Sequence, residues 1–158
     1  MKRIAALFLQ IVIVVAGVGA AALLLWEPQI EGRNAHASQF EIYFHDPFLV
    51  YAYIASIPFF VGLYQAFWIA GYAGRGEAFS EESAIAMRRI TVCALIIVAF
   101  VAGGEVFILT QSAGDDPAGG VVVGIVIAVA SLIVAGFATL LERTVRNGMA
   151  QPGLGSTV

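Results

Sequence analysis

Residues 47–71 form a continuous apolar stretch that contains no Asp, Glu, Lys, Arg or His. A helix of about 20 mainly apolar residues is long enough to cross the ~30 Å hydrocarbon core of a bilayer, and it satisfies its own backbone hydrogen bonds there. Three further apolar stretches have a similar length, at residues 4–26, 90–110 and 121–141. The sequence therefore predicts four membrane-spanning helices.

The composition agrees with a chain that lies mostly in lipid. Of the 158 residues, 60% are hydrophobic and 12% are charged, whereas a soluble domain has about 25% charged residues. We predict an all-α integral membrane protein, a four-helix bundle with antiparallel up-down connections. Residues 1–146 form one membrane domain, and residues 147–158 form a flexible C-terminal tail. The first stretch begins like a signal peptide, but it exceeds the ~7 to 15 residues of a signal-peptide apolar region, which favours an uncleaved span.

The basic residues divide unevenly between the two ends of these spans. Four spans place both chain termini on one side, and that side holds every Lys and Arg except Arg33. Cytoplasmic segments carry an excess of basic residues, so we predict a bacterial cytoplasmic (inner) membrane protein with both termini in the cytoplasm. The residues on the terminal side are Lys2, Arg3, Arg75, Arg88, Arg89, Arg143 and Arg146.

Small residues recur at helical spacing in the second and fourth spans. Small side chains let two helix backbones approach closely, which is how helices pack when lipid leaves little hydrophobic drive for association. We interpret these stripes as helix contacts, with a permeation path as the alternative, and they leave a homo-oligomer open. The stripes are Gly62, Ala66 and Ala70 in the second span, and Gly120, Gly124 and Ala128 in the fourth.

Glu105 is the acidic residue that falls inside a predicted span. A charged side chain at the centre of a membrane costs about 2.5 to 3.5 kcal/mol on insertion scales and normally faces the interior of a bundle. Counted from the outer ends of the helices, Glu105 and Tyr53 lie at the same depth. We therefore expect an intramembrane polar site in which Glu105 is hydrogen-bonded to Tyr53 or Ser56. The alternative is a proton or cation site at Glu105.

The sequence contains few residues in a pattern that could bind a metal or a cofactor. Glu41 and His45 are four residues apart and His36 is nearby, but structural zinc sites generally need four ligands, often cysteines. The single cysteine, Cys93, excludes an intrachain disulfide. We find no Ser-His-Asp set and no phosphate-binding glycine loop, so we predict no metal, no cofactor and no catalytic residue.

Several phrases of the chain resemble a known family. They are WEPQIEGRN after the first span, FEIYFHDPFLVYAYIASIPFFVGLYQAF through the second, and GEAFSEES with MRRI and CAL leading into the third. These phrases are similar to the YoaS-like family, small four-span bacterial membrane proteins of unknown function. The resemblance implies a fold and a membrane location. Some family members resemble partners of small helix-turn-helix regulators encoded beside them, and no catalytic residue is carried over.

Three functions from different classes follow as hypotheses. The favoured one is a non-enzymatic interaction or regulatory module, or an accessory subunit of a membrane complex, which contacts the bilayer and a protein partner and binds no nucleic acid directly. Its cytoplasmic partner surface would be Arg75, Arg88 and Arg89. The alternatives are a small oligomeric transporter or channel around Glu105, and a membrane enzyme that uses Glu105, His36 or His45. A transporter requires a polar cavity at midplane depth, and an enzyme requires converging acids and histidines.

Overall fold

The computed structural model describes residues 2–30, 47–111 and 118–150. Every regular element in these residues is an α-helix, and each of the four helices is long and apolar enough to cross a membrane. The prediction of an all-α protein with four membrane-capable helices is confirmed. The helices are α1 (Lys2–Ile30), α3 (Pro47–Arg75), α4 (Glu81–Gln111) and α5 (Ala118–Met149).

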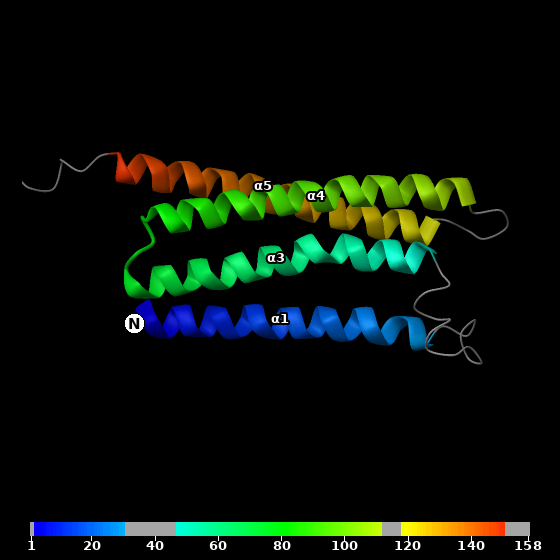
Figure 1. Ribbon diagram of the computed structural model, residues 1–158, viewed down its shortest axis with the longest axis horizontal. Coiled ribbons are helices and arrows are strands. Elements are labelled where there is room, and N and C mark those ends of the chain that lie inside the picture. The colour runs from blue at the N-terminus through cyan, green and yellow to red at the C-terminus, as the bar shows by residue number, and fades with distance from the viewer. Residues whose placement is uncertain (1, 31–46, 112–117, 151–158) are drawn as a thin grey trace, which may run out of the picture.

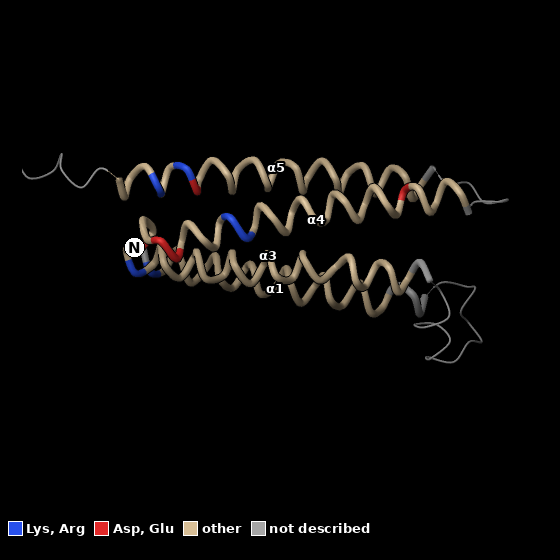
Figure 2. The backbone as a smooth tube through the Cα atoms, turned by 45° about the horizontal axis from the view of Figure 1, so that its top comes forward, with Lys and Arg blue, Asp and Glu red and all other residues tan. Residues whose placement is uncertain are grey.

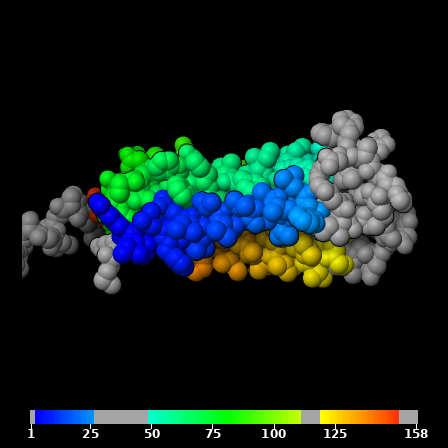
Figure 3. Space-filling model, turned by 90° about the horizontal axis from the view of Figure 1, so that it is seen from below, coloured from blue at the N-terminus to red at the C-terminus, as the bar shows by residue number. Residues whose placement is uncertain are grey.

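The helices alternate in direction and lie in the order α1, α3, α4, α5 (Figure 1). α3 packs on α1 and on α4, and α4 packs on α5, while α1 has its extensive contacts with α3 only. The start of α1 and the end of α5 lie at the same end of the molecule, which we call the terminal end. Figure 3 shows α1 as an outer ridge of the molecule, so the arrangement is closer to a row than to a closed bundle.

Each helix is longer than the membrane requires. The four helices have 29, 29, 31 and 32 residues, which at 1.5 Å per residue gives about 44 to 48 Å. This length exceeds the ~30 Å hydrocarbon core. Turns at the helix ends therefore extend into the polar region of the membrane, and the first turns of α4, before residue 90, are among them.

The connection between α3 and α4 is a tight turn with a defined helix cap. Gly76 has a φ of +83°, a left-handed conformation that glycine adopts without strain. The backbone N–H of Ser83 donates to the Ser80 hydroxyl at 3.2 Å, so Ser80 is the N-cap that its residue type favours. Phe79 packs on Gly148 of α5, where an added Cβ would lie 2.7 Å from the ring. The turn is therefore fixed to the end of α5 as well as to α4.

Small side chains form the contact between α4 and α5. Gly124 is buried, and an added Cβ there would overlap the Glu105 carboxyl. The Thr91 and Thr139 hydroxyls lie 3.3 Å apart across the same contact. Of the other small residues singled out in the sequence, Ala128 is half-buried and Gly120 is exposed beside Ile108. The remaining buried residues of this contact are Ala84, Met87, Ser131, Ala135, Ala138 and Val145.

A tyrosine joins α3 to α4 in the half of the bundle away from the terminal end. The Tyr51 hydroxyl donates to the Phe100 carbonyl at 2.6 Å, and the two rings pack edge to face. Gly103 leaves room for this hydroxyl, since an added Cβ would lie 2.6 Å from it. In the stripe on α3, Ala70 is 3% exposed, while Gly62 and Ala66 are half-buried.

Side-chain hydrogen bonds between described residues, among them those of Gln10 and Tyr53, hold α1 on α3. The Gln10 amide donates to the Phe67 carbonyl at 3.2 Å, and the Tyr53 hydroxyl donates to the Leu24 carbonyl at 2.9 Å. Between helices whose membrane-spanning parts carry no charge, a polar side chain that bonds to a neighbour's backbone is a typical means of attachment. Gln10, the polar residue within the first apolar stretch, thus has a structural role.

Candidate functional site

Charged residues gather at the terminal end of the helices (Figure 2). Every Lys and Arg in the described helices lies in the half of the molecule toward that end, and Arg33 lies outside the described residues. Among the acidic side chains that the structure describes, Glu105 alone lies toward the opposite end. The molecule therefore has two places where polar chemistry is concentrated, a cavity at the terminal end and the surroundings of Glu105.

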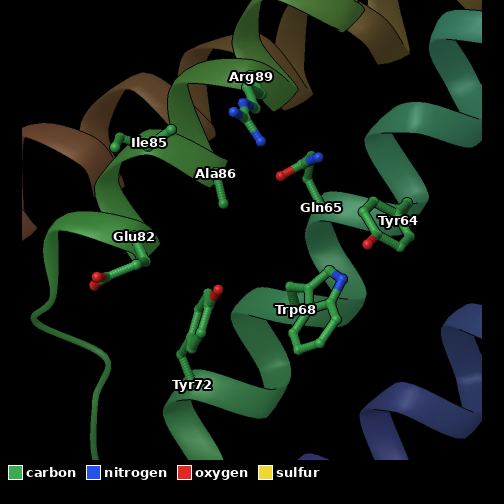
Figure 4. Close-up of a pocket in the computed structure, with 8 residues that line it drawn as sticks. All are labelled: Tyr64, Gln65, Trp68, Tyr72, Glu82, Ile85, Ala86 and Arg89. Atoms are coloured by element: carbon green, nitrogen blue, oxygen red, sulfur yellow. The ribbon is translucent and has the colours of Figure 1, made fainter.

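The cavity lies between α3 and α4 and has a volume of about 320 Å³ (Figure 4). On α4 its lining residues are spaced at i, i+3, i+4 and i+7, so they share one helix face. The lining residues are Tyr64, Gln65, Trp68 and Tyr72 of α3, and Glu82, Ile85, Ala86 and Arg89 of α4.

Aromatic rings form the α3 wall of this cavity. The ring centroids of Tyr64 and Trp68 are 6.2 Å apart, as are those of Trp68 and Tyr72. Arg75 lies over the Tyr72 ring, 5.0 Å from its centroid, and pairs with Glu77 at 2.8 Å. These contacts hold Tyr72 in place at the mouth of the cavity, and they satisfy Arg75 within the protein.

Unpaired polar groups face one another across the cavity. Gln65 is 7% exposed, yet in the part of the chain that the structure describes its amide makes no hydrogen bond. Figure 4 shows Gln65 of α3 and Arg89 of α4 directed toward each other, while Tyr72 and Glu82 lie nearer the start of α4, with the Glu82 carboxyl directed away from Arg89. Within the same described residues, neither Arg89 nor Glu82 forms an ion pair. The amide atoms of Gln65 are not among the fully enclosed side-chain atoms that lack a partner in the described residues, so they are reached from the cavity and offer hydrogen-bonding capacity to a ligand.

The three arginines expected to form a partner surface have different environments. Arg75 is engaged by Tyr72 and Glu77, and Arg89 lines the cavity. Arg88 is exposed and is not among the residues that line the cavity. Only Arg88 is therefore both turned away from the cavity and without an ion-pair partner among the described residues.

A second, apolar cavity of about 450 Å³ lies between α1 and α3. Residues 13–21 of α1 supply one side, and Phe60, Leu63 and Phe67 lie on the other. Tyr64 and Trp68 line this cavity as well as the polar one. The polar and apolar cavities therefore adjoin along α3.

The surroundings of Glu105 differ from the sequence expectation. Its carboxyl packs on Gly124 of α5, and its Oε2 atom is buried without a hydrogen-bond partner in the described part of the chain. The expected bonds from Tyr53 and Ser56 are not formed, since Tyr53 donates to Leu24 of α1 and Ser56 donates to the Tyr53 carbonyl. Direction explains the error, because depth alone does not fix the face of a helix. Residues two apart differ by about 200° around a helix, so Tyr51, not Tyr53, faces α4.

The candidate metal ligands cannot be placed. Glu41, His36 and His45 lie outside the described residues. Within residues 2–30, 47–111 and 118–150, no group of three or more His, Cys, Asp or Glu side chains is arranged to hold a metal ion.

Of the eight residues that line the polar cavity, the sequence interpretation singled out only Arg89. Gln65 and Trp68 fell within the second predicted span without a role of their own, and Tyr72 and Glu82 fell outside the predicted spans. A signal was present, because Tyr64, Trp68 and Tyr72 repeat every four residues and so form an aromatic stripe on one helix face. The pairing of that stripe with the α4 face could not be inferred from either helix alone.

Comparisons with known proteins agree with this architecture. Residues 31–151 match the family model described as "Protein of unknown function (DUF2975)". The chain is 32% identical over 150 residues to the uncharacterized membrane protein YoaS of Bacillus subtilis (strain 168), covering 94% of each protein. No solved structure matches the chain. The resemblance to the YoaS-like proteins noted from the sequence is confirmed.

Proposed function

This chain belongs to the DUF2975 family of proteins of unknown function, and we propose that it is a non-enzymatic interaction module of the bacterial cytoplasmic membrane. In this proposal it serves as a regulatory or accessory subunit and binds another protein at its terminal end. The termini lie in the cytoplasm, because the basic residues gather at that end and cytoplasmic segments carry such an excess.

The observation that carries this proposal is the position of Arg88. Arg88 is exposed on α4, and among the described residues it has no ion-pair partner. Its helix is held firmly at this point by the Ser80 cap and by the packing of Ala84 and Met87 against α5. A fixed, unpaired arginine at the membrane surface supports binding of an acidic protein surface, since arginine presents a planar set of donors to carboxylates.

The orientation is tested by thiol labelling. A cysteine in place of the exposed Glu77, in a Cys93→Ala background, should react with a membrane-impermeant reagent only after cells are lysed. Labelling of intact cells would show that the terminal end faces outward, and the proposed cytoplasmic surface would then be wrong.

The partner is sought by photo-crosslinking in living cells. A photoreactive residue in place of Arg88 should give a discrete protein adduct, and one in place of Leu109, which is exposed near the opposite end of α4, should not. Expression of untagged protein at higher level should compete for the adduct. Adducts of equal yield at both positions, or adducts that competition leaves unchanged, would contradict a specific surface at the terminal end.

A second function is favoured by one observation, the unpaired Oε2 of Glu105. An acidic side chain inside a span often marks a proton or ion pathway, so a small oligomeric transporter is the alternative. Glu105 lines neither of the two cavities between the helices, which weighs against it. Proton or cation flux in liposomes that Glu105→Gln abolishes would favour the transporter over the interaction module.

A further inference from the structure

The polar and apolar cavities adjoin at Tyr64 and Trp68, and they differ in chemical character. The polar cavity lies toward the terminal end, where Tyr72, Glu82 and Arg89 line it. The apolar cavity is displaced toward the middle of the helices, and both are lined by Tyr64 and Trp68. A polar space near a membrane surface that adjoins an apolar one matches the shape of an amphiphile.

The polar cavity holds charges of both signs. A guanidinium binds phosphate through two parallel hydrogen bonds, and Arg89 has no ion-pair partner among the described residues. Glu82 lines the same cavity from the same helix face as Arg89, two turns nearer the start of α4, and its carboxyl lies at the rim of the cavity (Figure 4). A carboxylate at that place attracts an ammonium group, and the faces of Trp68 and Tyr72 beside it also attract cations. The pair of charges therefore suits a zwitterion and disfavours a purely anionic headgroup.

The largely buried residue Gln65 is the second and independent indication of a ligand. It is 7% exposed, directed into the cavity, and without a hydrogen bond in the described part of the chain. An amide N–H₂ group donates to a phosphate oxygen. Gln65 and Arg89 face each other, so both can contact one phosphate.

The depth of the cavity fits the headgroup region. Arg89 directly precedes residue 90, where the apolar part of α4 begins. Trp and Tyr side chains are enriched at this level of a membrane, and Trp68 and Tyr72 lie there on α3. The phosphate of a phospholipid in the same leaflet lies at this level too.

We propose that the cavity between α3 and α4 binds the headgroup of an aminophospholipid. The phosphate contacts Arg89 and Gln65, the ammonium group contacts Glu82, and an acyl chain passes Tyr64 and Trp68 into the apolar cavity against α1. This inference does not depend on the proposed protein partner, because that partner is assigned to Arg88, which does not line the cavity.

The test is native mass spectrometry of the full-length protein after removal of endogenous lipid. The protein is titrated with dioleoyl phosphatidylethanolamine, with dioleoyl phosphatidylglycerol, and with soluble glycerophosphoethanolamine. We expect the phosphatidylethanolamine adduct to form at about tenfold lower lipid concentration than the phosphatidylglycerol adduct, since one charge-assisted contact distinguishes them. The soluble headgroup should bind far more weakly than the lipid, because it lacks the acyl chain.

Neighbouring residues supply matched variants. Arg89→Gln should weaken phosphatidylethanolamine binding about tenfold, whereas Arg88→Gln, with the same change one residue away, should leave binding within twofold. Glu82→Gln should strengthen phosphatidylglycerol binding and bring the two lipids close to parity, a gain that misfolding cannot produce. Equal binding of both lipids to the unmodified protein, equal effects of the two arginine changes, or soluble headgroup binding as tight as the lipid would overturn the proposal.

Discussion

The α1–α3 pair and the α4–α5 pair are joined in different ways. None of the described residues of α1 is fully buried, and side-chain-to-backbone hydrogen bonds, among them those of Gln10 and Tyr53, attach it to α3. In contrast, α5 buries five residues, most of them small, against α4. Lipid competes equally for apolar side chains, so close backbone approach distinguishes the second contact. The comparison indicates a firm α4–α5 unit and a more loosely attached α1.

The strongest way to break the firm pair is Gly124→Leu. A larger side chain there must displace the Glu105 carboxyl and separate α5 from α4, so we expect a loss of about 2 to 3 kcal/mol, the upper part of the range for overpacking. Thermal unfolding in mild detergent, followed by circular dichroism, measures it.

The control for that change is Val122→Leu. Val122 is 59% exposed, and the substitution on this lipid-facing surface should change the melting temperature little. Similar melting temperatures for both variants would mean that the small residues of α5 do not determine its packing.

The loosely attached pair is tested by removing the hydrogen bonds of Gln10 and Tyr53. The double variant Gln10→Leu with Tyr53→Phe should lower the free energy of unfolding by about 1 kcal/mol, because such bonds average about 0.6 kcal/mol each in membrane proteins. Thermal unfolding in detergent gives this value.

Disulfide crosslinking shows which helix contact the double variant weakens. Cysteines at Ala6 and Gly74, which are in contact between α1 and α3, should crosslink less efficiently in the double variant. Cysteines at Ile108 and Gly120, between α4 and α5, should crosslink as before. A fall in both yields would indicate that α1 supports the whole bundle and is not an independent attachment.

The smallest expected effect is that of Glu105→Gln. It tests whether the α1–α3 pair and the α4–α5 pair are coupled through Tyr53 and Glu105. Glu105→Gln should change stability by less than about 0.5 kcal/mol, because Oε2 has no partner to lose within the described residues. Since Tyr53 bonds to α1 and not to Glu105, Glu105→Gln and Tyr53→Phe should be additive within about 0.5 kcal/mol in a double-mutant cycle. A coupling energy above about 1 kcal/mol would show that Tyr53 and Glu105 interact, as the sequence analysis expected, and would contradict the structure.

The sequence was sufficient to predict where the helices are, but it was insufficient to predict which face of each helix contacts a neighbour. Uninterrupted apolar runs bounded by charged residues predict the number, order and length of membrane helices, and Ser80 identifies the start of α4 because its hydroxyl can cap the free amides. A span that is apolar on all sides has no pattern that shows which side meets a neighbour. For this reason the sequence paired Tyr53 with Glu105 from their counted depth, whereas the Tyr53 hydroxyl is directed toward α1.

The candidate site was predictable only in part for the same reason. Arg89 was recognised from its charge at a membrane boundary. Gln65 and Trp68 acquire their role from the α4 face across the cavity, and that relation depends on how two helices are rotated against each other. The requirement that Gly103 leave room for Tyr51 is likewise visible only once both helices are in place.

The contact of Phe79 with Gly148 connects the C-terminal end of α5 to the helix that lines the polar cavity. Phe79 directly precedes the Ser80 cap, and Ser80 fixes the first turn of the helix that carries Glu82 and Arg89. A protein that binds the chain beyond Met149 and displaces α5 would shift the Phe79 ring. Through the Ser80 cap, this shift would also move Glu82 and Arg89. A displacement of the C-terminal end of α5 would thus reach a site formed by two other helices.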